Sequence, residues 1–451
     1  MRTKICNILF YITKLAILAT IFITFVIGQR VFYEETLFYF WGNITILLLY
    51  IGGVYIAGRV YNGFNFGNSG RQELVFSWVM CLLIANAMQY LILSLRVEDL
   101  IPPIGILIIM GVQTVIIAPL TVFADKLYFL CHPSHKAIII YGSKEKLYEY
   151  NMKISLHRSK FKVMRTISQD DKTGVLLDSI DGAESVFFLD VESSKQEWLL
   201  EYCYLHNKYI YILPTFSDVL LNTAKTLWLA NVPAFSLKNP KPEMTTQMAK
   251  RLLDIFISTL AILISLPLMI IIGIVIFIYD RESILYKQTR VTRGGRHFTL
   301  YKFRSMTPDA ESDGVPRLTA KDDNRVTPIG RFIRKTRLDE LPQLFNVLSG
   351  KMSLVGPRPE RPEIAKLYEE QHPNFAFRTK VKAGITGYAQ IYGQYNTAPD
   401  EKLLLDIMYI ESFSILLDIK LLFQTIRVIF MKTSTEGIEK GSTTALREED
   451  K

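Results

Sequence analysis

The sequence has few cysteines and few charged residues, and these two shortages exclude several classes of protein. Its 451 residues include four cysteines, which lie far apart and form no C-x-x-C pair. Neither a disulfide framework nor a cysteine zinc site is therefore supported, and we expect reduced thiols. Charged residues make up 21% and hydrophobic residues 49%, with a mean hydropathy of +0.20. This composition excludes a disordered, collagen-like or fully soluble chain and predicts that lipid surrounds part of it.

What the sequence has instead is long apolar runs. Four of them, at residues 8–27, 37–57, 74–95 and 101–123, have about the length that crosses a bilayer as a helix. Basic residues favour one side of this topology by six to two, so both ends of the segment should be cytoplasmic. The six are Arg2, Lys4, Lys14, Arg59, Arg71 and Lys126, and the two are Arg30 and Arg96. A cleaved signal peptide is the alternative for the first run, but no small-x-small cleavage site ends that run.

Between residues 136 and 236, β-rich runs alternate with polar segments of helix length. Runs at 137–141, 162–166, 185–191 and 209–213 predict a parallel, Rossmann-like α/β sheet. The first run is followed by Gly142-Ser143-Lys144, a turn that lacks the second and third glycines of G-x-G-x-x-G. A nucleotide site and a module for docking or subunit contact are both open interpretations of this domain.

A fifth apolar run, residues 255–278, is long enough to span a membrane but has basic residues on both flanks. These are Lys250 and Arg251 before the run, and Arg281, Lys287 and Arg290 after it. Pro267 near the middle removes a helical hydrogen bond, and Ser265 can satisfy part of the freed backbone. A bent, re-entrant helix that enters and leaves by the cytoplasmic face accounts for both features. An ordinary fifth crossing is the alternative.

The next segment has the richest chemistry. Residues 281–380 contain 20 Lys and Arg against 12 Asp and Glu, which suits a polyanion beside a membrane. Nucleic acid is a poor candidate, because no recognition motif accompanies this charge. Apolar spacing over 337–350 predicts a helix with Pro342 in its first turn, so that Asp339 and Glu340 lie at its N-terminus. Free N–H groups there favour ionised acids and can receive phosphate oxygens.

Basic residues in three neighbouring motifs are candidates for phosphate binding. Period-two alternation in a strand at 299–304 puts Lys302 and Arg304 on one face. Arg358 lies between two prolines, whose restricted φ angles limit the freedom of its backbone. Lys382 precedes a glycine turn able to approach a diphosphate closely. A solvated strand edge and an ordinary glycine turn are the alternatives for the first and third motifs.

In this order, the motifs resemble the polyprenyl-phosphate glycosyl-1-phosphate transferases, also called bacterial sugar transferases or monotopic phosphoglycosyl transferases. The matching pieces are KR at 250–251 with Asp254, YKFRSM at 301–306, LDELPQ at 338–343, LVGPRP at 354–359, KAGITG at 382–387 and LDIK at 417–420. The four-helix start and the α/β module are similar to the long subclass of this family.

The resemblance implies transfer of a sugar 1-phosphate from a UDP-sugar to undecaprenyl phosphate, with release of UMP, as the first membrane step of a surface glycan pathway. It implies that Asp339 is the nucleophile of a phosphosugar–aspartyl intermediate and that Glu340, with Asp339, helps to hold Mg²⁺. Asp418 is implied as a further site residue. Gln394 stands where the family commonly has arginine, so that one phosphate contact is weakened or supplied elsewhere. Leu266 separates Ser265 from Pro267, whereas the family usually has an adjacent Ser-Pro pair.

We therefore expect a membrane α plus α/β protein of the inner (cytoplasmic) membrane, with its catalytic domain in the cytosol. The predicted parts are a four-helix transmembrane bundle (1–128), a Rossmann-like domain (136–236), a linker (237–249), a re-entrant helix (250–280), an α+β catalytic domain with amphipathic interfacial helices (281–435) and a polar tail (436–451). Residues 306–327 are expected to form a loop over the nucleotide sugar. Membrane lipid and a second copy of the chain are further candidate partners.

Two rival functions remain on the sequence alone. The first is a nucleotide-sugar glycosyltransferase, which would release UDP, although the catalytic segment has no D-x-D motif. The second is a membrane scaffold in which the α/β module senses a ligand and the transferase segment is degenerate. The complete set of Lys302, Asp339, Glu340 and Arg358 argues against the scaffold.

Overall fold

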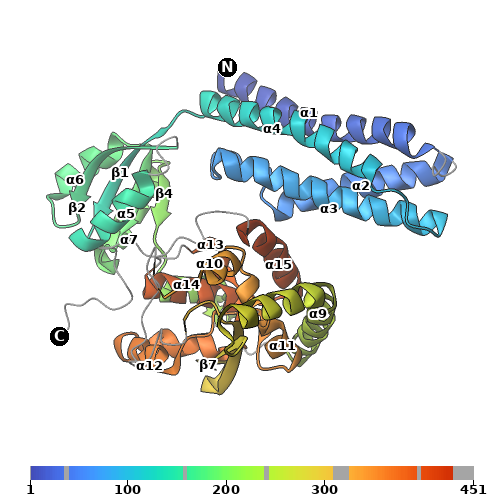
Figure 1. The fold of residues 1–451 in the computed structure, drawn as a ribbon. Helices are drawn as coiled ribbons and strands as arrows, with labels where there is room; N and C mark the ends of the chain where they lie inside the picture. Colours follow the sequence, from blue (N-terminus) through green and yellow to red (C-terminus); the bar gives the residue numbers. More distant parts are fainter. Residues whose placement is uncertain are drawn as a thin grey trace. The chain divides into compact units, whose positions relative to one another are not determined.

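The computed structural model describes residues 2–34, 40–155, 160–237, 243–307, 323, 325–393 and 398–429. The chain divides into two compact units, Met1–Leu213 and Pro214–Lys451 (Figure 1). Gln394, the tail and most of the loop predicted over 306–327 lie outside the described residues.

One predicted domain boundary is wrong. The predicted middle domain extends to residue 236, whereas in the structure the chain from Pro214 onward belongs to the second unit. The reason is apolar burial, because Val219 of α8 (Phe216–Asn222) packs in one cluster with Tyr368 and Ile407. The predicted linker is also shortened, since helix α9 already begins at Met244.

The first unit opens with four long helices, which contain the described parts of the predicted apolar runs except residues 101–103, just before the fourth helix. They are α1 (Arg2–Phe32), α2 (Phe40–Val60), α3 (Arg71–Val97) and α4 (Ile104–Cys131). Helix α4 packs against α1 and α3, and α3 packs against α2. With α9, they are the five helices of the described chain that are long and apolar enough to cross a membrane, which indicates a membrane protein.

Buried polar side chains connect these four helices. Asn86 Nδ2 of α3 donates to Gln113 Oε1 of α4 at 2.8 Å. Gln113 Nε2 in turn donates to Tyr50 Oη of α2 at 3.0 Å and to the carbonyl of Ile21 in α1 at 3.2 Å. Polar groups inside an apolar bundle need such partners, so the network specifies how the helices pair.

A parallel sheet follows, as the alternating runs predicted. Its strand order is β2-β1-β3-β4, and each neighbouring pair is parallel. The elements are β1 (His135–Tyr141), α5 (Lys144–Ser155), β2 (Phe161–Ser168), α6 (Thr173–Asp181), β3 (Ser185–Leu189), α7 (Ser193–Leu205) and β4 (Tyr209–Ile212). Alternate residues of β1 enter two different cores, with Ile138 and Ile140 in one and Ala137 and Ile139 in the other.

Packing accounts for the glycine that follows β1. A Cβ at Gly142 would collide with the backbone carbonyl of Asp190, in the loop after β3. The amide of Glu192 in the same loop donates to Gln169 Oε1 at 2.8 Å, which ties it to the loop after β2. Gly142 is therefore required by the close approach of two loops, whether or not the domain binds a nucleotide.

The second unit combines one long helix with many short elements. After α8 come the hairpin β5 (Lys225–Leu229) and β6 (Val232–Ser236), α9 (Met244–Asp280), and the hairpin β7 (Leu285–Val291) and β8 (His297–Phe303). Then follow α10 (Pro328–Lys335), α11 (Gln343–Leu348), β9 (Ser353–Val355), α12 (Pro362–Gln371), β10 (Gly384–Thr386), α13 (Tyr388–Tyr392), α14 (Pro399–Glu411) and α15 (Ile415–Ile429). One core joins Ile262 of α9, Leu300 of β8, Val347 of α11 and Leu421 of α15.

Candidate active site

The acidic pair lies on a 3₁₀ turn, Leu338–Glu340, between α10 and α11. Arg337 before it has φ 56°, a left-handed conformation that ends α10 and reverses the chain. The prediction of one helix starting at the acids is therefore corrected: α11 begins only at Gln343, after Pro342. Leu338 packs against the cluster of Phe303 and Ile333, and this contact anchors the turn to β8 and α10.

Glu340 is bound by two cations from distant parts of the sequence. Lys302 Nζ of β8 lies 2.8 Å from Glu340 Oε1, and Arg358 Nη2 lies 3.0 Å from the same oxygen. Burial would raise the pKa of Glu340, but Lys302 and Arg358 outweigh burial and hold that pKa well below its usual value. Glu340 is therefore ionised throughout the physiological range.

Asp339, in contrast, has no hydrogen bond or ion pair to its carboxylate within the described part of the chain. Asp339 as a whole is only 8% exposed to solvent. Burial is the largest cause that raises the pKa of Asp339, and the charge of Glu340 adds to the rise, whereas Lys302, Arg334 and Arg358 oppose it. The net pKa is about 6. Glu340 is thus an ionised carboxylate bound by two cations, whereas the Asp339 carboxylate has no such partner among the described residues.

Arg334 is a site residue that the sequence reasoning missed. It is not among the candidate phosphate-binding or catalytic residues that the motifs indicate. The structure puts Arg334 in the last turn of α10, near enough to Asp339 to stabilise its charge. Arg334 lies only five residues before Asp339, and this was the only hint in the sequence that the two side chains meet. The left-handed residue Arg337, which brings them together, cannot be predicted from the spacing of apolar residues.

Arg304 does not join the acidic pair. Strand β8 ends at Phe303, and the buried Arg304 side chain pairs with Asp280 at the end of α9, with Glu282 4.0 Å away. Lys302 and Arg304 therefore do not serve the acidic pair together, because Asp280 binds the Arg304 guanidinium. Arg304 instead ties the end of the apolar helix to this unit.

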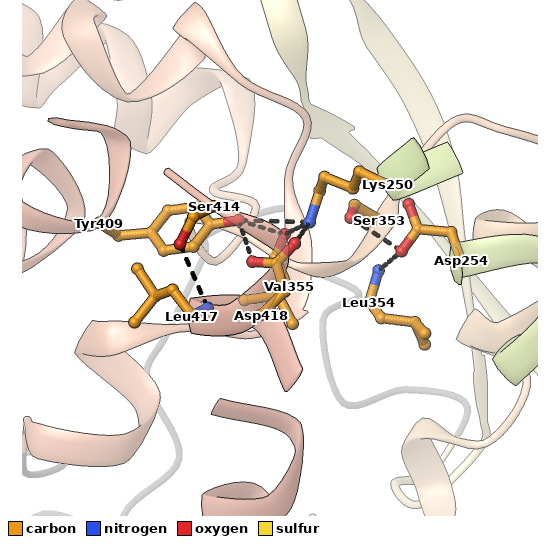
Figure 2. Close-up of polar contacts among 9 residues, drawn as sticks. All are labelled: Lys250, Asp254, Ser353, Leu354, Val355, Tyr409, Ser414, Leu417 and Asp418. Atoms are coloured by element: carbon orange, nitrogen blue, oxygen red, sulfur yellow. Dashed lines mark hydrogen bonds and ion pairs between the residues drawn. The ribbon is translucent and has the colours of Figure 1, made fainter. Parts of the chain in front are cut away.

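Within the described residues, neither Asp418 nor Lys382 has a hydrogen bond or ion pair with the acidic pair. Asp418, on α15, forms a buried ion pair with Lys250 and accepts a hydrogen bond from Tyr409 Oη at 2.8 Å (Figure 2). Burial lowers the pKa of the half-buried Lys382, and the charge of Arg251 lowers it further. Of the predicted phosphate ligands, the structure thus brings only Lys302 and Arg358 to Glu340 in the part of the chain it describes.

Helix α9 runs unbroken from Met244 to Asp280, with Pro267 inside it. Ser265 Oγ donates to the carbonyl of Ala261 at 2.6 Å, so its hydroxyl bonds one turn back as serines in apolar helices do. Many side chains of the apolar stretch are exposed, with Ile264 at 73% and Ile271 at 57%, and these need lipid or protein to cover them.

Two carboxylates are available for a divalent cation. Within the described residues there is no group of three or more His, Cys, Asp or Glu side chains that could hold a metal ion. Mg²⁺ is nevertheless commonly bound by one or two carboxylates together with substrate phosphates and water. Both cations contact Oε1 of Glu340, which leaves Oε2 and the Asp339 carboxylate as oxygen ligands. This donor set fits Mg²⁺ that arrives with a phosphorylated substrate.

Comparison with known proteins places these motifs in one family. Residues 245–432 match the family described as bacterial sugar transferase. An uncharacterized sugar transferase of Bacillus subtilis is 43% identical over 159 residues, which are 35% of this chain and 74% of that protein. The chain belongs to the bacterial sugar transferase family.

Other relatives have more specific names. A UDP-N-acetylgalactosamine-undecaprenyl-phosphate N-acetylgalactosaminephosphotransferase of Aeromonas hydrophila is 36% identical over 52% of this chain and 55% of its own length. An undecaprenyl-phosphate glucose phosphotransferase of Komagataeibacter xylinus is 42% identical over 42% of this chain and 37% of its own length. The chain thus matches about half or less of the length of these two relatives. Their names also differ in the sugar, so family membership alone does not specify the donor.

Proposed function

We propose that this protein transfers a sugar 1-phosphate from a UDP-sugar to undecaprenyl phosphate, releasing UMP, at the cytoplasmic face of the inner membrane. One observation carries the proposal: two adjacent acids have different surroundings. Asp339 is buried and has no hydrogen-bond partner for its carboxylate among the described residues, whereas Lys302 and Arg358 bind the Glu340 carboxylate. Relatives named as undecaprenyl-phosphate sugar phosphotransferases support the same reaction. The product would start a surface polysaccharide.

The first step uses Asp339 as nucleophile. Its carboxylate oxygen attacks the sugar-bearing phosphorus, the bond from that phosphorus to the bridging oxygen breaks, and UMP leaves with the bonding electrons. A carboxylate whose pKa is about 6 is mostly ionised at pH 7 and more basic than an exposed aspartate. No described residue donates a hydrogen bond to the Asp339 carboxylate, which leaves its lone pairs available for attack.

The cations beside Glu340 suit the charge on the donor. Lys302 has three N–H donors and Arg358 has five, so each keeps donors for phosphate oxygens after binding Glu340. Glu340 holds the two cations close together, because both contact its Oε1. Mg²⁺, when bound by Asp339 and Glu340, would supply further positive charge to the phosphates.

In the second step, a phosphate oxygen of undecaprenyl phosphate attacks the same phosphorus. The bond to Asp339 breaks, the carboxylate is regenerated, and the sugar 1-phosphate is now joined to the lipid phosphate. Two successive displacements at one phosphorus give a ping-pong sequence in which UMP leaves before the lipid reacts.

A re-entrant α9 would keep this site in the cytosol, and the contacts of α9 support that topology. Near its start, Arg251 donates to the carbonyls of Val347 and Leu348 at 2.7 Å each. Near its end, Ile276 packs in the cluster of Phe303, and Asp280 pairs with Arg304. Since both ends pack on the same polar unit, a straight crossing would draw that unit into the bilayer.

The deciding experiment identifies the nucleotide product. Membranes that contain the protein are incubated with undecaprenyl phosphate and a panel of UDP-sugars, and the released nucleotides are separated. UMP from one or more donors supports the proposal. UDP instead would indicate an ordinary glycosyltransferase, and no release from any donor would favour the scaffold. Membranes with the Asp339→Asn protein are the matched control.

A further inference from the structure

Two buried residues one turn apart on α9 hold the backbone of β9. Asp254 Oδ1 accepts hydrogen bonds from Ser353 Oγ at 3.1 Å and from the amide of Leu354 at 3.0 Å. Lys250 Nζ donates to the carbonyl of Val355 at 3.0 Å. Figure 2 shows both side chains directed at this short strand. Lys250 is 8% and Asp254 3% exposed, so water does not compete for these bonds.

The charge of Lys250 is balanced inside the same cluster. Asp418 of α15 pairs with Lys250, and Tyr409 Oη of α14 lies 2.8 Å from Asp418 Oδ1 and 3.1 Å from the Val355 carbonyl. A buried charge without such partners would be strongly destabilising. Lys250 of α9 and Tyr409 of α14 therefore both reach the Val355 carbonyl, and Asp418 of α15 binds each of these two side chains.

Little backbone freedom remains between Val355 and Arg358. The amide of Gly356 donates to the carbonyl of Thr386 at 2.8 Å, and a Cβ at Gly356 would collide with the backbone of Lys382. Pro357 has a fixed φ, and its carbonyl accepts from the amide of Gly384 at 2.9 Å. The place of β9 therefore determines where the Arg358 guanidinium meets Glu340.

We propose that Lys250 and Asp254 are positioning residues that act through Arg358: they fix β9 so that the guanidinium reaches Glu340 and the phosphates of the donor. The membrane helix thereby holds part of the active site as well as anchoring the protein. This inference rests on the proposed function for its readout, since Arg358 is assigned there to the donor phosphates. Nothing in the motif pattern assigns these roles to Lys250 and Asp254.

The first test replaces Asp254 in two ways. Both of its hydrogen bonds end on Oδ1, and an amide oxygen can accept both, so Asp254→Asn should keep kcat/KM for the UDP-sugar within about threefold. Asp254→Ala removes the acceptor and should lower kcat/KM by about 10- to 100-fold, as expected for a misplaced binding group. Equal losses in the two variants would overturn the proposed hydrogen-bond role.

The second test asks whether the fall in kcat/KM caused by Asp254→Ala depends on Arg358. The double-mutant cycle combines Asp254→Ala with Arg358→Lys, a substitution that shortens the side chain carrying the charge. In the Arg358→Lys background, Asp254→Ala should lower kcat/KM for the UDP-sugar by at most about a further threefold. The same loss in both backgrounds would mean that Asp254 supports the fold alone. Val219→Ala, in a separate cluster of the same unit, is the control for general destabilisation and should combine independently with Arg358→Lys.

A milder substitution gives a test that does not depend on whether Asp254→Ala folds. Tyr409→Phe keeps the ring and removes only the hydroxyl at Asp418 and Val355, so it should fold and lower kcat/KM in an Arg358-dependent way. An independent loss would contradict the proposal. Failure of the proposed function is distinguishable, because the wild-type protein would then release no UMP, whereas failure of this inference leaves wild-type turnover with independent mutational effects.

Discussion

Asp339 and Glu340 are adjacent in the chain but have opposite electrostatic surroundings. Two cations bind Glu340 and hold its pKa well below its usual value, whereas burial raises the pKa of Asp339 to about 6. Carboxylates with pKa values moved apart are typical of sites where one group reacts and the other organises charge. This difference gives each acid a separate, testable role.

Asp339→Asn should abolish turnover. The amide is a poor nucleophile, so neither UMP nor a covalent adduct should form when the variant meets the donor that the wild-type protein uses. UMP release and the intact mass of the protein measure the two outcomes. An unchanged melting temperature or an increase would show that the variant is folded, and normal activity would refute the nucleophile role.

The first half-reaction should depend on pH near the pKa of Asp339. Attack needs the ionised carboxylate, so the UMP burst without lipid acceptor should fall as pH drops through about 6. Omitting the acceptor removes the titration of its phosphate from the profile. A burst rate that stays constant down to pH 4.5 would contradict the raised pKa.

Stability should depend on the same group with a defined sign. The folded-state pKa of Asp339 lies above its usual 3.8, so at neutral pH the folded protein holds an unfavourable buried charge. Asp339→Asn should therefore raise the melting temperature at pH 8 by a few degrees, a gain that fades as pH falls through about 6 and is lost below about 4. A gain that instead grew on acidification would contradict this sign.

Arg304 should prove structural. Arg304→Met leaves the partly buried Asp280 without this partner and should lower stability by up to about 3 kcal/mol, while the double variant with Asp280→Leu recovers most of that loss. The double variant should keep KM for the UDP-sugar within about threefold, whereas Lys302→Met should impair it by at least tenfold. A large KM increase in the double variant would restore Arg304 as a phosphate ligand.

The topology of α9 can be tested with single cysteines. Glu243→Cys and Ser283→Cys, both exposed and flanking α9, are placed in a variant that lacks the four native cysteines. A re-entrant helix predicts that an impermeant maleimide added outside labels neither one. Asp99→Cys, between α3 and α4, should be labelled and serves as the positive control. Labelling at Ser283→Cys from outside would indicate a straight crossing.

Local patterns predicted the elements well. The four β-rich runs and their parallel order follow from apolar alternation and spacing, which depend on neighbours in the chain. Cys81, Cys131 and Cys203 are buried. The meeting of Lys302, Glu340 and Arg358 was indicated only by their family motifs, and the structure brings them together.

The apolar helices, the α/β sheet and the acidic pair can be predicted from local sequence, because each is a property of a short stretch of chain. The pairing of Arg304 with Asp280 and the bonds from Lys250 and Asp254 to β9 are visible only in the folded chain. Those bonds join residues that are 105 and 100 positions apart for Lys250–Val355 and Asp254–Leu354. Contacts at such separation depend on how whole elements pack, and burial then gives a single hydrogen bond its effect.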